Sequence, residues 1–200
     1  DGMLVTGSCG QCEIWTDDQD ARGDVGEACA LAYQLRVYDS LLRLQGDARM
    51  GDLMERTIFN ALFASQSPDG RQLRYFAPLE GNRVYWKTDT YCCPCNFRRI
   101  IAELPALVFY RAPDGITVNL YAPAEAKLKL DNGPPVSIRQ ETDYPNSGRV
   151  RIGLDRNIGT NTFTAGANEG GWTYGSPNGY IAIDGGNRVL PDQVLFRHLR

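Results

Sequence analysis

The residues of this chain whose types could do chemistry are its six cysteines, which fall into two groups. One group lies in the first thirty residues and the other forms a single Cys-Cys-Pro-Cys tetrad; the members are Cys9, Cys12, Cys29, Cys92, Cys93 and Cys95. A disulfide framework would be spread along the chain, and adjacent cysteines pair poorly because a disulfide needs Cα atoms about 5.5 Å apart. Metal or thiol chemistry is therefore the better interpretation.

The cysteine spacing is compatible with two different metal sites. Zinc takes thiolates, imidazoles and carboxylates, and the only histidine, His198, lies near the far end of the chain, so Cys, Asp and Glu would have to supply most ligands. A structural four-thiolate site would use two C-x-x-C pairs, formed by Cys9, Cys12, Cys92 and Cys95. The alternative site would use Glu27, Cys29, Cys92 and Cys93. Spacing alone does not decide between the two sites, although two C-x-x-C pairs are the stronger general indication of a metal site.

Three helical segments are predicted to position these cysteines. The range 26–44 has an apolar face at steps of three and four residues and is followed by Gly46 as a stop. Asp47 can cap a second helix that runs up to the break at 67–70. A third helical stripe follows the tetrad and is expected to kink or end at Pro105. Between the second and third helices, the aromatic ranges 73–76 and 83–86 suggest a hairpin.

The periodicity changes from helical to alternating near residues 112–115, which predicts a domain boundary. The ranges 117–121, 127–130, 136–139 and 150–152 each alternate polar and apolar residues, with turn residues between the later ones. We therefore expect an α+β fold, with residues 1–112 mainly helical and residues 113–200 forming an antiparallel β-sandwich. The range 157–186 is rich in Gly and Asn and predicts no definite strand.

Composition excludes several classes of function. The hydrophobic content of 42% is typical of a globular protein, and the net charge is −3 without a basic run, so nucleic acid is not an expected partner. There is no apolar stretch of about 18 residues, so no membrane-spanning helix is expected. The first residues carry no targeting signal, and neither compartment nor oligomeric state can be inferred from the sequence.

A set of short segments resembles, in order, the signature segments of glycoside hydrolase family 127, the β-L-arabinofuranosidase family. The segments are Thr6-Gly7-Ser8, Gly26-Glu27-Ala28-Cys29-Ala30, residues 41–47, Asp52-Leu53-Met54-Glu55-Arg56, Asn60-Ala61-Leu62, Pro78-Leu79-Glu80 and Cys92-Cys93-Pro94 with Asn96. Residues 142–145 show a weaker resemblance to the same family. The resemblance implies a zinc site formed by Glu27, Cys29, Cys92 and Cys93, in which Cys92 is also the nucleophile.

The resemblance also implies roles for three further residues. Glu13, fourteen residues before Glu27, is the candidate acid/base, although its local sequence does not match the family motif closely. Glu55 and Tyr75 fall on positions that resemble sugar-contacting residues. Each has a structural alternative: an ion pair of Glu55 with Arg56 or Arg36 on a solvated helix face, and packing of Tyr75 in a hairpin. For Cys29 the alternative is a small buried apolar side chain.

The fold implied by the resemblance is an (α/α)6 barrel followed by β-sandwich domains. The predicted helices are too few to close such a barrel, so the chain is expected to be either a piece of a longer protein or a degraded gene product, and to lack much of the sugar pocket. The implied activity is retaining hydrolysis of L-arabinofuranosides or related glycans, with carbohydrate as the partner and Zn²⁺ as the cofactor. The rival hypothesis is a non-catalytic module that is stabilised by a four-cysteine zinc site and binds a glycan or a protein.

Overall fold

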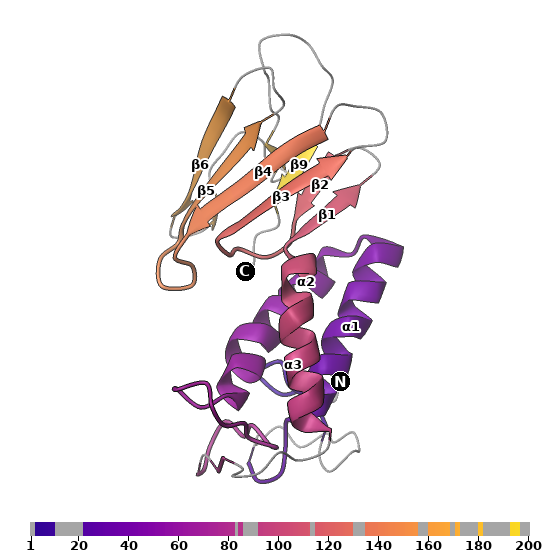
Figure 1. Ribbon diagram of the computed structural model, residues 1–200, viewed down its shortest axis with the longest axis vertical. Helices are drawn as coiled ribbons and strands as arrows, with labels where there is room; N and C mark the ends of the chain where they lie inside the picture. Colours follow the sequence, from indigo (N-terminus) through magenta and orange to yellow (C-terminus); the bar gives the residue numbers. More distant parts are fainter. Residues whose placement is uncertain are drawn as a thin grey trace. The chain divides into compact units, whose positions relative to one another are not determined.

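The computed structural model describes residues 3–10, 22–82, 84–85, 92–112, 115–129, 135–155, 160–168, 171–172, 180–181 and 193–196. The chain divides into two compact units, Asp1–Leu104 and Pro105–Arg200. The first contains the α-helices and the second contains the β-strands, which confirms the α+β class (Figure 1).

Helix α1 (Ala28–Gln45) is bounded by two glycines with positive φ. Gly26 (φ 69°) turns the chain into Glu27, whose extended backbone forms the N-cap. Gly46 (φ 64°) ends the helix, and its N–H donates to the carbonyl of Leu42 at 2.8 Å. This left-handed C-cap is the glycine stop that the sequence predicted.

The second helical segment begins as predicted but does not remain an α-helix. Asp47 caps α2 (Ala48–Thr57) by accepting from the backbone N–H of Arg49 at 3.0 Å. The segment then continues as a π-helix, η1 (Ile58–Leu62), and a 3₁₀ turn, η2 (Phe63–Ser65). Single π-helical turns within a helix occur often at functional sites.

Helix α3 (Cys93–Glu103) begins directly at the cysteine tetrad. Pro94 lies in its first turn, where the missing N–H costs nothing. Pro105 falls in the 3₁₀ turn η3 (Leu104–Leu107) that follows, which confirms the expected end of the helix there. Helix α1 packs against both α2 and α3, and a two-pronged ion pair joins Arg36 of α1 to Glu103 of α3 at 2.8 and 2.9 Å.

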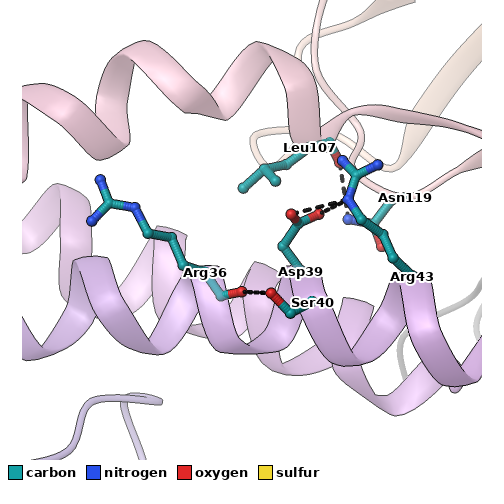
Figure 2. A network of polar contacts seen from close by, with 6 residues as sticks. All are labelled: Arg36, Asp39, Ser40, Arg43, Leu107 and Asn119. Carbon is teal, nitrogen blue, oxygen red and sulfur yellow. Dashed lines mark hydrogen bonds and ion pairs between the residues drawn. The ribbon is translucent and has the colours of Figure 1, made fainter.

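The core of this helical unit is formed by one face of each helix. Its most deeply buried large side chains are Leu4, Val25, Leu31, Leu35, Met54, Leu62 and Ile100. Local polar contacts also run along α1: Arg43 pairs with Asp39, and Ser40 donates to the carbonyl of Arg36 at 2.9 Å (Figure 2). Within the described residues, no helix is both long and apolar enough to cross a bilayer.

The second unit contains two sheets. One has the order β1-β2-β9-β8, formed by Phe109–Ala112, Gly115–Val118, Gln193–Phe196 and Tyr180–Ile181. The other has the order β3-β4-β5-β6-β7, formed by Ala124–Lys129, Pro135–Thr142, Arg149–Asp155, Thr160–Asn168 and Gly171–Trp172. The four predicted alternating ranges overlap strands β2, β3, β4 and β5.

The strands of this unit surround a core of inward-facing apolar side chains, of which Ile138, Val150 and Val118 are among the most buried. The predicted antiparallel pairing is confirmed for the other strand pairs of the described residues, whereas β2 and β9 pair in parallel. Parallel neighbours require a long connection, and the chain between β2 and β9 supplies one. Asn119, which follows β2, donates through Nδ2 to the carbonyl of Leu107 at 2.9 Å (Figure 2).

Candidate metal and active site

Three thiols from two different helices come together in the first unit. The Sγ atoms of Cys29 and Cys93 are 3.0 Å apart, and those of Cys92 and Cys93 are 3.9 Å apart. All three sulfur atoms lie within 4.8 Å of one another. Cys93 is fully buried, Cys29 is half-buried and Cys92 is the most accessible of the three. Such a group has the donor atoms and the spacing of a thiolate metal site.

The cluster forms because the N-terminal ends of α1 and α3 lie next to each other. Cys29 is in the first turn of α1, while Cys92 is the N-cap and Cys93 the first residue of α3. Helix N-termini present unpaired N–H groups and a partial positive charge, which favour a negative sulfur. The N-terminal ends of α1 and α3 therefore both favour negative charge at the same cluster of thiols.

Burial works against the thiolate form in this cluster. Burial raises the pKa of the Cys29 thiol and of the Cys93 thiol. Three adjacent thiolates would repel one another without a cation. Soft sulfur donors that are held close together and need a positive charge fit zinc or a similar thiophilic metal.

Glu27 lies immediately before this cluster and is held by backbone pairing. Its side chain is 3% exposed, and its backbone pairs with Phe76 in an antiparallel bridge. The N–H of the following residue, Ala28, donates to the carbonyl of Tyr75 at 3.0 Å. Burial, and a hydrogen bond with Glu27, raise the pKa of the Tyr75 hydroxyl. The Glu27 carboxylate thus contacts the Tyr75 hydroxyl. Among the described residues, the group of ligand atoms within 4.8 Å of one another consists of the three sulfur atoms and does not include Glu27.

Gly26 lets three segments meet beside Glu27. Its N–H donates to the carbonyl of Gly10 at 3.0 Å, and its carbonyl accepts from Ala77 at 3.1 Å. A Cβ at this position would lie 2.9 Å from Ser8 Oγ and 3.2 Å from the Ala77 carbonyl oxygen. Because no larger residue fits this space at a positive φ, the glycine allows the close approach that fixes Glu27.

Glu55 is buried on α2, with 5% of its surface exposed. Glu55 therefore does not lie on a solvated helix face, and Arg36, one of its two suggested ion-pair partners, pairs with Glu103. A carboxylate is seldom buried without partners, which makes Glu55 a candidate for a polar role. The ring of Tyr75 packs against Phe76 with centroids 4.6 Å apart, while its hydroxyl meets Glu27, so packing and a polar contact coexist.

The cysteines of the rival four-thiolate site are not brought together in the described part of the chain. Cys9 is buried and donates to Gln34 Oε1 at 3.0 Å, and burial raises its pKa to about 11. Cys95 is exposed and its sulfur is 3.9 Å from Arg98 Nη2. Neither belongs to the metal-competent group. Cys12 and the candidate acid/base Glu13 lie outside the described residues.

The segment Cys92-Cys93-Pro94 with Asn96, which resembles the family signature, also contributes a buried amide next to the tetrad in the chain. Asn96 is buried on α3. It lies three residues after Cys93, a spacing that puts both on one helix face.

Comparison with known proteins gives matches over both units. The model of the GH127 β-L-arabinofuranosidase catalytic domain matches residues 1–106, and the model of the GH127 middle domain matches residues 115–189. The non-reducing end β-L-arabinofuranosidase of Bifidobacterium longum subsp. longum is 26% identical over 196 residues, covering 87% of this chain and 29% of the relative.

Two solved structures are similar as well. A GH127 β-L-arabinofuranosidase from Geobacillus stearothermophilus T6 has a TM-score of 0.69 at 28% identity, covering 76% of this chain and 27% of that one. A second GH127 β-arabinofuranosidase has a TM-score of 0.68 at 31% identity, covering 76% of this chain and 25% of that one. The chain therefore spans less than a third of the length of these relatives.

Proposed function

This chain belongs to glycoside hydrolase family 127, and we propose on that basis that it contributes the thiol centre of a retaining glycoside hydrolase that acts on β-L-arabinofuranosides. The observation that carries the proposal is the cluster of Cys29, Cys92 and Cys93 at the meeting point of two helix N-termini. Family membership alone would not identify the reacting atoms, whereas this cluster supplies a candidate nucleophile.

Zinc is the proposed metal, and Glu27, Cys29, Cys92 and Cys93 are the proposed ligands. Three sulfur atoms within 4.8 Å support the thiolate part of this set. Glu27 is buried two residues before Cys29, and its hydrogen-bond partner Tyr75 also lies in the electrostatic field of Cys92 and Cys93. When bound, zinc would keep the sulfur atoms as thiolates at neutral pH, where a free thiol with a pKa of about 8.5 is mostly protonated.

Cys92 is the proposed nucleophile because it is the most accessible member of the cluster. Its sulfur attacks the anomeric carbon of the arabinofuranosyl unit and forms a C–S bond as the glycosidic C–O bond breaks. Glu13 is the proposed acid and donates its proton to the departing oxygen. This step leaves a glycosyl thioether on Cys92 and a carboxylate at Glu13.

The second step returns the enzyme to its starting state. The Glu13 carboxylate removes a proton from water, and the water oxygen attacks the anomeric carbon as the C–S bond breaks. Two inversions at the same carbon give net retention of configuration. Glu55 and Tyr75 are proposed to bind sugar hydroxyls; the burial of Glu55 supports a polar role over a solvated ion pair.

The domain organisation is part of the same proposal. Residues 1–112 would be the C-terminal part of an (α/α)6-barrel catalytic domain, and residues 113–200 a β-sandwich domain. The helices of the first unit and the match of residues 1–106 to the family's catalytic domain support the first assignment. The β-strands of the second unit and the middle-domain match over residues 115–189 support the second.

Trapping the covalent intermediate tests the proposed function. The longest protein that contains this chain is incubated with an aryl β-L-arabinofuranoside that has a good leaving group, quenched with acid and digested. A mass increase of one arabinofuranosyl unit is expected on the peptide that carries Cys92. An adduct on a carboxylate, or wild-type turnover in Cys92→Ser, would refute the mechanism.

Replacement of the acid tests the second role in this proposal. Glu13→Gln is expected to slow turnover by about 10²- to 10⁴-fold, the usual contribution of a general acid. The loss should be smaller for substrates whose leaving groups need no proton. Equal losses for good and poor leaving groups would exclude Glu13 as the acid.

A further inference from the structure

Arg74 is a buried arginine in the segment that follows the helical turn η2. It is only 3% exposed, although arginine is seldom buried without partners. Its Nε donates to the carbonyl oxygen of Ala64 at 2.9 Å, and its Nη2 donates to the same oxygen. The guanidinium also lies over the ring of Tyr85, with Cζ 5.7 Å from the ring centroid. Arg74 therefore uses both its donors and its planar face inside the helical unit.

The Ala64 carbonyl belongs to the last turn of the helical segment that α2, η1 and η2 form. The last carbonyls of a helix have no partner within the helix and carry a partial negative charge. The guanidinium of Arg74 supplies a donor and a positive charge at that end. The backbone N–H of Arg74 donates to the Ser65 carbonyl in the same turn at 2.7 Å. Arg74 thus holds its own segment of chain against the end of this helix.

The residues directly after Arg74 hold Glu27 through the backbone. The carbonyl of Tyr75 accepts from the N–H of Ala28 at 3.0 Å, and Phe76 pairs with Glu27 in an antiparallel bridge. Glu27 is the N-cap of α1 and has an extended backbone. Because an N-cap residue lies only half inside its helix, its backbone depends on the chain that pairs with it.

We infer that Arg74 is a positioning residue for Glu27, and that its guanidinium holds residues 74–77 in the place from which they fix the Glu27 backbone. This inference rests on the proposed function, in which Glu27 is a zinc ligand and Tyr75 contacts the sugar. It adds a residue outside both sets. Without the guanidinium, residues 74–77 would shift relative to the helix end, and the Glu27 carboxylate and the Tyr75 ring would move with them.

A role in helix stability alone and a role in positioning have different consequences. If Arg74 only stabilised the helix end, its loss would lower the stability of the whole helical unit. If it positions Glu27, the loss is concentrated in the backbone bonds between residues 74–77 and the start of α1, since local opening has its own free energy. Lysine can supply one donor and a positive charge to the Ala64 carbonyl, but it lacks the planar fork that contacts Tyr85 as well.

Amide hydrogen exchange of the full, metal-free chain distinguishes the two roles. Arg74→Met keeps a long side chain without a donor. In this variant the Ala28 N–H is expected to exchange about 10- to 100-fold faster, the effect of losing a hydrogen bond from a charged donor. The N–H of Leu35, in the middle of α1, should change much less. Arg74→Lys should restore part of the protection at Ala28, because it keeps one donor.

Leu42→Ala is the control for a general loss of stability. Leu42 is buried near the C-terminal end of α1, so its truncation removes core contacts and leaves residues 74–77 unchanged. Any acceleration of exchange in this control should be at least as large at Leu35 as at Ala28. If Arg74→Met does not fold, Arg74→Lys carries the same expectations with smaller effects.

Zinc affinity tests the consequence for the site. It is measured on the reduced full chain by competition with a chromophoric chelator, at a temperature where every variant is folded. Arg74→Met is expected to bind zinc about 10- to 100-fold more weakly, the usual effect of losing a residue that orients a ligand. Leu42→Ala should bind zinc as the wild type does.

Two results would overturn the inference. Unchanged exchange at Ala28 in Arg74→Met, or equal acceleration at Ala28 and Leu35, would show that Arg74 does not hold the segment that pairs with Glu27. Wild-type zinc affinity in Arg74→Met beside a loss in Glu27→Gln would show that the ligand does not depend on Arg74. If Glu27→Gln also binds zinc normally, the ligand set in the proposed function fails, and exchange at Ala28 alone decides the role of Arg74.

Discussion

The Sγ atoms of Cys29 and Cys93 lie 3.0 Å apart although the residues are 64 positions apart in the sequence. This contact joins the first turns of α1 and α3 and brings Cys92 with it. The contact makes Cys29, Cys92 and Cys93 the candidate metal site, and two predictions about their thiol chemistry follow from it.

Cys29→Ser and Cys93→Ser are each expected to lose zinc, because a hydroxyl is a much poorer ligand for this metal than a thiolate. Metal content after dialysis, measured by mass spectrometry of the element, should fall from about one zinc per chain to near zero. Cys9→Ser and Cys95→Ser are the controls and should retain the metal, since neither sulfur belongs to the cluster. Loss of metal in the two controls with retention in Cys29→Ser would instead support the four-thiolate site.

Removal of the metal should expose the close thiol pair to oxidation. After chelation and treatment with diamide as the oxidant, Cys29 and Cys93 are expected to form a disulfide, since adjacent Cys92 and Cys93 pair poorly. Peptide mapping without reduction identifies the cross-link, and added zinc should slow its formation. A cross-link that involves Cys9 in place of Cys29 would contradict the geometry.

The ion pair between Arg36 and Glu103 is expected to make a small, pH-dependent contribution to the stability of the helical unit. The hydrogen bond from Arg36 lowers the pKa of Glu103. The stabilisation is therefore complete above the ordinary carboxyl pKa of about 4.3 and is lost as pH falls through the lowered value. The side chains are 30% and 45% exposed, so the contribution should stay below about 1 kcal/mol.

Urea unfolding of Glu103→Gln at neutral and strongly acidic pH measures that contribution. The variant should be less stable than wild type near neutrality and equal to it in acid, where the wild-type carboxyl is protonated. Glu80→Gln, in a more exposed pair with Arg22, is the control and should change stability less. A stability difference for Glu103→Gln that persists in acid would show that charge is not its cause.

Gly26→Ala is expected to destabilise the helical unit by about 1 to 3 kcal/mol, because the new Cβ combines a left-handed backbone with a close contact. That Cβ would lie 2.9 Å from Ser8 Oγ. Gly46→Ala is the matched control, since Gly46 also has a positive φ but a Cβ there meets nothing within 4 Å. Gly46→Ala should lower the free energy of unfolding by about 1 kcal/mol, because it only places a non-glycine residue at a positive φ.

Chemical denaturation of both glycine variants gives the comparison, and zinc affinity adds a second measurement. Because Gly26 precedes Glu27, its variant should also bind zinc more weakly, whereas Gly46→Ala should not. Equal losses of stability in the two variants would mean that the protein accommodates the new Cβ beside Ser8 without strain.

Local features of the sequence determined the helices and many strands of this protein. The apolar steps of three and four residues, the Asp47 cap, the Gly46 stop and the position of Pro105 all act within one or two turns of chain, and the structure confirms them. Alternation likewise located the central strands β4 and β5. The π-helix η1 was not predicted, because apolar residues at every fourth position suit an α-helix equally well.

Tertiary structure decided which of these residues meet. Two C-x-x-C pairs and the alternative set that includes Glu27 were both compatible with the spacing, because spacing describes only neighbours in the chain. The packing of α1 on α3 brought Cys29 to Cys92 and Cys93, and Glu55 is buried on α2, which also packs against α1. The parallel pairing of β2 with β9 was decided in the same way, since a contact between distant segments depends on how the whole unit buries its apolar surface.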